Sequence, residues 1–405
     1  LALTFGYTMI VAETAIGRMT RKSPVGAFKS FGKKKWLSFG GWINAVIPVL
    51  IVPYYSVIGG WVIKYLVEYF RGNAKQLAED GYFTDFISNG VSTELCFMAF
   101  CAFTLIIIFA GVQNGIERVS KIMMPILIVL SVIIAVYSVT RPGALAGVKY
   151  FLVPNVKNFS WMTVVSAMGQ MFYSLSIAMG ILITFGSYMK KDTAIEDSTR
   201  NVEVFDTGIA IMAGLMIIPA VFAFSGGDPD TLQAGPSLMF ITIPKVFQNM
   251  GFGTVIGIVF FLLVLFAAVT SSIALTESAV STFEDELGWG RKKATVLVGV
   301  IMLVLGSLSS LGYGPLAGIK IIGMQFLDLF DFLTNSVMMP IAALLTSLLV
   351  SRVVGIDKIE AEIIHGESAF RRKKVFVVMI KYLCPVFAII ILLSSVANAL
   401  GWIKM

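Results

Sequence analysis

The chain has 405 residues, of which 57% are hydrophobic and only 14% are charged. This composition lies far outside the range of soluble globular domains and indicates a polytopic membrane protein. The net charge of +7 does not indicate nucleic-acid binding, because the basic residues form short clusters between apolar segments, as the positive-inside rule predicts. Cys96, Cys101 and Cys384 fall in or at the edge of apolar segments without metal-ligand spacing, so they are expected to be small core residues.

Hydropathy predicts ten membrane-spanning segments, on the criterion that one crossing needs roughly 20 apolar residues. They cover residues 1–17, 37–70, 95–112, 119–139, 160–189, 203–224, 252–283, 294–312, 323–351 and 374–402. We therefore expect an all-α polytopic membrane protein, folded as a single transmembrane bundle over residues 1–405.

The loop that follows the first span predicts the orientation of the bundle. Residues 18–35 carry seven basic side chains and no acid, which places this loop in the cytoplasm. The basic clusters at 190–191, 291–293 and 371–374 fall on the same side. The first span must then run inward, so we expect a further helix with a cytoplasmic N-terminus before residue 1.

The span at 161–188 is interrupted at its centre by the sequence QMFYSLSIAMG, residues 170–180. A broken helix survives in a bilayer only where its freed backbone groups line a cavity or bind an ion, which is how secondary transporters hold solutes and sodium. The alternative is a kinked helix, in which Gln170, Ser174 and Ser176 merely pack against neighbouring helices. This stretch alone does not decide between the two.

Other polar residues within spans are candidates for ion binding. Asp206 stands in the apolar segment 204–219, and a carboxylate facing a bundle interior is costly and therefore functional by default. The structural alternative is a salt bridge at the cytoplasmic end of that helix. Thr270 and Ser271 lie side by side in an apolar helix, where hydroxyls can also simply bond to carbonyls of the preceding turn.

Eight motifs, in register along the whole chain, resemble those of the neurotransmitter:sodium symporters, in particular bacterial amino-acid transporters of the leucine-transporter type. They are ETAIGR (13–18), PYYSVIGGW (53–61), GIERVSKIMMP (115–125), GQMFYSLSIAMG (169–180), AGPSLMFITIP (234–244), VTSSIAL (269–275), FEDEL (283–287) and DLFDF (328–332).

The resemblance implies a fold of two inverted five-helix repeats followed by peripheral helices. Residues 1–139 are expected to form the first repeat without its first helix, residues 160–351 the second repeat, and residues 374–402 a peripheral helix. The chain as given then contains family helices 2 to 11.

The same resemblance implies two sodium sites. Ala267, Thr270 and Ser271 match the protein half of one site, and Ser174 and Asp206 match part of the other. Many family members have Asn at the position of Asp206, and the chloride-dependent ones add a chloride ion to balance charge. Because Asp206 provides a fixed negative charge, we expect no chloride requirement.

For the substrate, Tyr55 resembles the family tyrosine that binds the amino-acid carboxylate. The other matching positions carry no charge, which predicts an apolar substrate side chain, aliphatic or aromatic; at helical spacing, Met and Leu can equally be plain packing. These positions are Ile51, Tyr173, Ser174, Ser176, Ala178, Met179, Ser272 and Leu275.

Gates are implied on both sides of the site. Asp331 resembles the outer-gate acid and Tyr173 the aromatic lid, while Asp285 resembles the inner-gate acid, with Tyr188 near it. The alternative for Asp285 is that the acids of 283–287 cap a helix end. Glu13 is expected to support loop structure at the cytoplasmic face.

The sequence thus predicts a sodium-coupled importer of neutral hydrophobic amino acids, multi-pass in a bacterial inner membrane and working by alternating access. Its partners are the amino acid, sodium ions and the lipid bilayer, and its oligomeric state stays open, a homo-oligomer included. An enzyme is not expected, since the sequence has no nucleotide-binding loop or nucleophile constellation. The alternatives are a truncated or non-transporting solute sensor of the same fold, or a proton-coupled transporter with Asp206 as the proton carrier.

Overall fold

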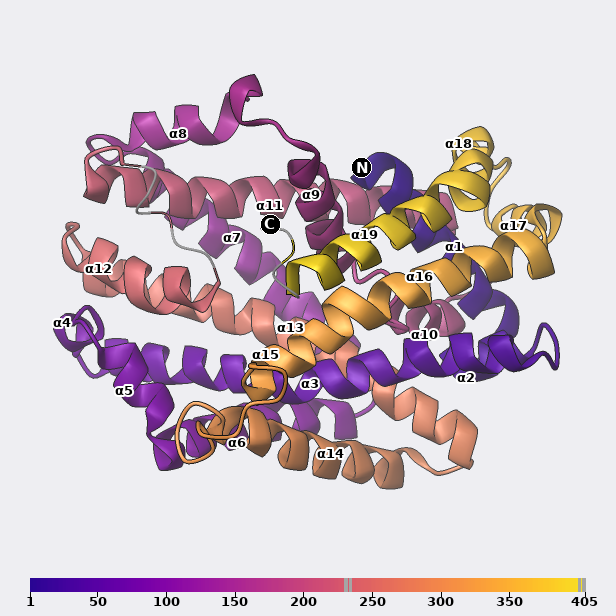
Figure 1. Cartoon of the computed structure of the whole chain (residues 1–405), viewed down its shortest axis with the longest axis horizontal. Helices are drawn as coiled ribbons and strands as arrows, with labels where there is room; N and C mark the ends of the chain where they lie inside the picture. The colour runs from indigo at the N-terminus through magenta and orange to yellow at the C-terminus, as the bar shows by residue number, and fades with distance from the viewer. Residues whose placement is uncertain (229–231, 233–234, 400–401, 403–405) are drawn as a thin grey trace.

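The computed structural model describes residues 1–228, 232, 235–399 and 402, and it is helical almost throughout these residues. Eight described helices are long and apolar enough to cross a membrane, and Figure 1 shows the long helices lying along a common axis. They are α3 (Lys35–Phe70), α6 (Gly90–Phe109), η2 and α7 (Val112–Val139), α11 (Ile195–Ser225), α13 (Gly253–Leu287), α14 (Arg291–Leu311), α15 to η7 (Phe326–Val354), and α18 to α19 (Lys373–Ala399).

The two remaining predicted spans are also helical, but each is unusual. The first consists of η1 (Ala2–Gly6) and α1 (Tyr7–Thr20), and it carries Glu13 and Arg18. The other is divided into α9 (Trp161–Ser174) and α10 (Ile181–Tyr188). The prediction of an all-α membrane bundle, with its spans in this order, is confirmed.

Short helices cover the two ends of the bundle. At one end, on the left of Figure 1, lie α4 (Ala74–Leu77), α5 (Tyr82–Ser88), α8 (Ala144–Leu152) and, after η5 (Leu238–Thr242), α12 (Ile243–Gln248). At the other end lie α2 (Pro24–Lys29) and α17 (Ile356–Ile363).

The segment η5 is fixed to the bundle by Phe240. This side chain is 1% exposed and contacts the rings of Trp61, Tyr65 and Phe83. The hydroxyl of Tyr65 donates to the carbonyl of Phe240 at 2.7 Å. Aromatic pairs of this kind add to the stabilisation that burial supplies, so this anchor holds the α12 region against α3.

Glycines let α1 and α10 approach backbone to backbone. A Cβ at Gly17 would lie 2.0 Å from the carbonyl oxygen of Ile183, and one at Gly186 would lie 2.5 Å from that of Thr14. Small residues permit such close packing between membrane helices. The second half of the broken span is thereby seated directly on α1.

Candidate functional site

The interruption between α9 and α10 is a break in the helix and not a kink. Residues 175–180 lie outside both helices, and Gly180 has a φ of 71°. Ser176 and Ala178 have φ values of 55° and 59°, a region that residues with a Cβ rarely adopt and that costs about 1–3 kcal/mol each. Surrounding contacts must hold this conformation in place.

One of these contacts comes from Glu13 on α1. Its side chain is fully buried, and its Oε1 accepts the backbone N–H of Ala178 at 2.9 Å. The expectation that Glu13 supports a loop at the cytoplasmic face is therefore wrong. The sequence did contain a signal, because a carboxylate within an apolar span marks a functional position.

Replacing Glu13 with alanine is expected to lower the free energy of unfolding by about 1–3 kcal/mol, because the N–H of Ala178 loses its buried acceptor. Glu13→Gln keeps a carbonyl oxygen and should retain most of the stability. Thermal unfolding in detergent distinguishes the variants. Equal destabilisation by both substitutions would show that the charge, and not the hydrogen bond, stabilises the break.

A cavity of about 450 Å³ lies at the break. It is bounded by α3, α7, α9, α10 and α13, and no charged side chain of the described chain lines it. Most of the predicted site residues meet here. They are Ile51, Tyr55, Tyr173, Ser174, Ser176, Met179, Thr270, Ser271 and Leu275.

The structure adds a wall that the sequence did not indicate. Ile116, Ser120 and Met124, from η2 and α7, face the same cavity. All three lie in the motif at 115–125, which marked this segment without assigning any of its residues to the site, and the packing of α7 against α13 is what places them at the cavity.

Two predicted pocket residues lie elsewhere. Ser272 is fully buried and its hydroxyl pairs with that of Thr104 on α6 at 3.1 Å, so it is turned away from the cavity. Ala178 is also fully buried and does not line the cavity; its contribution is the N–H that Glu13 accepts. The position of Ser272 depends on the rotation of α13 about its axis, and that of Ala178 depends on the path of the chain through the break. Sequence spacing specifies neither.

The first candidate sodium pair is brought together across two helices. The hydroxyl of Ser174, at the end of α9, donates to Oδ1 of Asp206 on α11 at 2.6 Å. Among the described residues, Asp206 has no basic partner, so the salt-bridge alternative finds no support. A carboxylate and a hydroxyl beside freed backbone are the oxygen donors that transporters use for sodium.

The second candidate sodium group lies on one turn of α13. The hydroxyl of Thr270 donates to the carbonyls of Phe266 and Ala267, at 3.1 and 3.0 Å, as a hydroxyl in a membrane helix commonly does. Ser271 faces the hydroxyl of Tyr55. Ala267 offers its carbonyl, while its side chain does not line the cavity. The oxygens are clustered, although Thr270 is turned back onto its own helix.

A second cavity, of about 370 Å³, lies on the far side of Tyr173. Tyr173 lines both cavities, which places its ring between them. Asp331 borders the second cavity and accepts from Tyr54 at 3.1 Å and from Asn335 at 2.6 Å. Tyr173 and Asp331, the two residues predicted for the outer gate, therefore both line this second cavity.

The residues predicted for the inner gate have different partners. Tyr188 donates to Glu277 at 2.7 Å and not to Asp285. Asp285 instead accepts the backbone N–H of Ser23, just before α2, at 2.5 Å. Tyr188 and Asp285 were expected to lie near each other, but they have separate partners. Tyr188 on α10 contacts Glu277, and Asp285 contacts the loop before α2.

Glu277 is the centre of a network that the sequence analysis missed. It is fully buried, and both of its oxygens accept from Arg291, at 3.1 and 2.6 Å. Arg291 also donates to the carbonyl of Ile108 at 2.9 Å. The network joins α10, α13, α14 and α6, and the available signal was an acid within an apolar helix.

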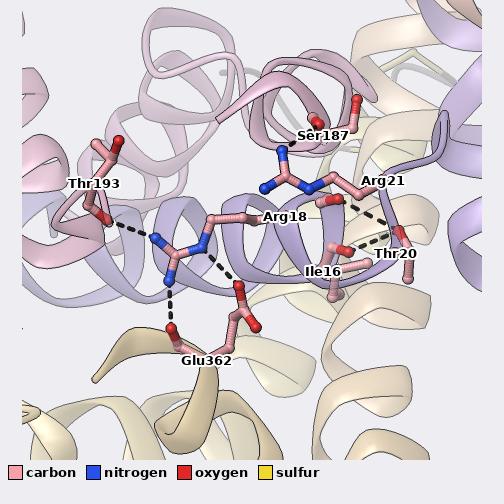
Figure 2. Close-up of polar contacts among 8 residues, drawn as sticks. Ile16, Arg18, Thr20, Arg21, Ser187, Thr193 and Glu362 are labelled. Atoms are coloured by element: carbon pink, nitrogen blue, oxygen red, sulfur yellow. Dashed lines mark hydrogen bonds and ion pairs between the residues drawn. The ribbon is translucent and has the colours of Figure 1, made fainter. Parts of the chain in front are cut away.

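Arg18 lies in α1 and not in the loop that was predicted to begin at residue 18. It is fully buried at the end of α1 and donates to Oε1 of Glu362 at 2.7 Å and to the carbonyl of Thr193 at 2.5 Å, as Figure 2 shows. Nearby, Arg21 donates to the carbonyl of Ser187 at 3.1 Å. These contacts hold the chain after α10 against both α1 and α17.

Comparison with known proteins agrees with this geometry. Residues 67–402 match the model of the sodium:neurotransmitter symporter family. An uncharacterised sodium-dependent transporter of Bacillus subtilis, YhdH, is 33% identical over 97% of this chain and 87% of its own length. Another, from Haemophilus influenzae, is 30% identical over 97% of this chain and 88% of its own length.

The fold is also that of a solved transporter structure. The crystal structure of MhsT in complex with L-phenylalanine matches with a TM-score of 0.85 and 33% identity, over 96% of this chain and 88% of that one. The sequence match and the fold match thus extend over nearly the whole chain. The chain belongs to the sodium:neurotransmitter symporter family, whose members are transporters and not enzymes.

Proposed function

We propose that the protein imports neutral hydrophobic amino acids together with sodium across a bacterial inner membrane. The observation that carries this proposal is the uncharged cavity at the helix break, beside which the Ser174 and Asp206 oxygens meet. Broken helices at a midplane cavity bind solute and sodium in secondary transporters.

The lining of the cavity supports the choice of substrate. Its volume of about 450 Å³ is within the range of small-molecule sites. Tyr55 offers a hydroxyl for the carboxylate, while Ile51, Met179 and Leu275 offer apolar surface. The similarity to a transporter solved with L-phenylalanine supports an aromatic or large aliphatic side chain.

Sodium is a co-substrate in this proposal. Ser174 and Asp206 contribute to one ion site, and Ala267, Thr270 and Ser271 contribute to the other. Each sodium ion that enters down a potential of about 100 mV gains roughly 2.3 kcal/mol, and this gain drives uptake. Because Asp206 supplies a fixed negative charge, transport does not require chloride.

Alternating access would use the contacts at the two ends of the cavity. Tyr173 and Asp331 close the outer side, and Tyr188 and Asp285 close the inner side through their separate partners, Glu277 and the loop before α2. In the proposed division, residues 1–139 belong to the first repeat and residues 160–351 to the second, and these move relative to each other.

An amino-acid panel tests the substrate class. Uptake of radiolabelled leucine, phenylalanine, aspartate and lysine is measured in proteoliposomes under an inward sodium gradient, with protein-free liposomes as the control. Leucine and phenylalanine should accumulate at least about tenfold more than the charged amino acids, because burying an unpaired charge in this cavity is costly. Equal accumulation of lysine or aspartate would contradict the proposed specificity.

A further inference from the structure

Two basic side chains, Arg352 and Lys381, lie together on the surface of the bundle, away from both cavities. Arg352 is on η7 (Leu349–Val354) and Lys381 is on η8 (Met379–Leu383). With Ser351 and Tyr382 they line a small pocket of about 200 Å³. The segment η7 continues α16 (Met339–Leu348) and η8 leads into α19 (Cys384–Ala399), and α16 and α19 run side by side, as Figure 1 shows.

Neither cation has a counter-charge among the residues that the structure describes. Within the described chain, Arg352 and Lys381 take part in no ion pair and no hydrogen bond, although neighbouring basic residues do. Arg372 pairs with Glu203 and Lys373 pairs with Glu360 in the same region. Two unpaired like charges beside each other repel, so the pocket favours an anion.

The surroundings of the pocket are those of a lipid-facing surface. Lys381 lies in a membrane-spanning helix that begins at Lys373, about 12 Å further along the helix axis. On the same side of this helix, Val378, Tyr382 and Val386 are 50%, 65% and 49% exposed. The cations therefore stand at the level where a leaflet's headgroups meet its acyl chains.

We propose that this pocket binds the headgroup of an anionic phospholipid. The phosphodiester lies between Arg352 and Lys381, the hydroxyls of Ser351 and Tyr382 are available as donors, and an acyl chain follows Val378 and Val386. Basic pockets between membrane helices bind anionic headgroups in this manner. Charge-assisted hydrogen bonds from a guanidinium and an ammonium to phosphate are among the strongest available.

The chemistry of the pocket favours an anionic lipid over a zwitterionic one. A phosphatidylcholine headgroup brings its own cation, which Arg352 and Lys381 would repel. Free phosphate matches the charge but gains nothing from the exposed apolar side chains Val378 and Val386. Selectivity for the intact anionic lipid is therefore the specific expectation.

The test uses the purified full chain in detergent and native mass spectrometry with added phosphatidylglycerol, phosphatidylcholine or inorganic phosphate. The variant is Arg352→Gln combined with Lys381→Gln. The matched control is Lys292→Gln combined with Lys293→Gln, which removes two exposed basic residues at the start of α14. Lys381→Arg, which keeps the charge, serves as a second variant.

The wild type should bind phosphatidylglycerol about tenfold more tightly than phosphatidylcholine. The Arg352→Gln and Lys381→Gln pair should remove this preference, while the control and Lys381→Arg should keep it. The proposal is overturned if the double variant retains the preference, if the control loses it equally, or if inorganic phosphate competes as well as the lipid. Because the readout is lipid binding, the result is independent of whether the proposed transport is correct.

Discussion

Replacement of Asp206 with alanine is expected to lower the apparent sodium affinity of transport by about 100-fold. The substitution removes a carboxylate that meets Ser174 at the end of α9, and interactions with a charged partner contribute up to about 3 kcal/mol. The measurement is initial uptake of radiolabelled leucine in proteoliposomes as a function of sodium concentration.

The substitution Asp206→Asn removes the negative charge and keeps nearly the same side-chain shape, so it tests the charge alone. Wild-type uptake should be unchanged when chloride is replaced by gluconate, whereas Asp206→Asn should lose sodium affinity and gain stimulation by chloride. The matched control is Asp197→Asn, on the same helix, where the carboxylate pairs with Arg371 at the surface. A sharp fall in wild-type uptake on removal of chloride would contradict the assignment of Asp206 as the fixed negative charge that replaces chloride.

Arg291→Ala is expected to lower the free energy of unfolding by about 3–5 kcal/mol, because it leaves a buried charge uncompensated. Glu277 is fully buried and both of its oxygens accept from Arg291. The variant also removes the donor to the carbonyl of Ile108. The midpoint of thermal unfolding in detergent measures the effect.

Two further variants control for this prediction. Lys29→Ala breaks the more exposed pair with Glu286 and should cost no more than about 1 kcal/mol. Glu277→Gln combined with Arg291→Gln removes both charges and should be less destabilising than Arg291→Ala alone. If Arg291→Ala unfolds at the wild-type temperature, the network does not stabilise the bundle.

Hydropathy was sufficient to predict the order of the spans. A bilayer requires long apolar helices, so segments such as 37–70 and 252–283 appear directly in the sequence. The stretch at 170–180 left two alternatives open, a broken helix and a kinked one. The positive φ values of Ser176 and Ala178 show that the helix is broken there.

The partners of buried charges could not be predicted in the same way. Arg18 and Glu362 are 344 positions apart in the chain, and only the folded bundle brings them together. Glu13 and Glu277 did have a local signal, but the groups that donate to them lie elsewhere in the chain, in the break at Ala178 and on α14 at Arg291. The rotation of Ser272 toward α6 likewise depends on how α13 packs, which hydropathy does not encode.

The most direct test of the account is radiolabelled leucine uptake into proteoliposomes with sodium or choline outside. Sodium coupling predicts accumulation above the external concentration with an inward sodium gradient and none with choline, at constant pH. Uptake that is indifferent to the replacement of sodium by choline, or that follows a proton gradient alone, would contradict sodium coupling.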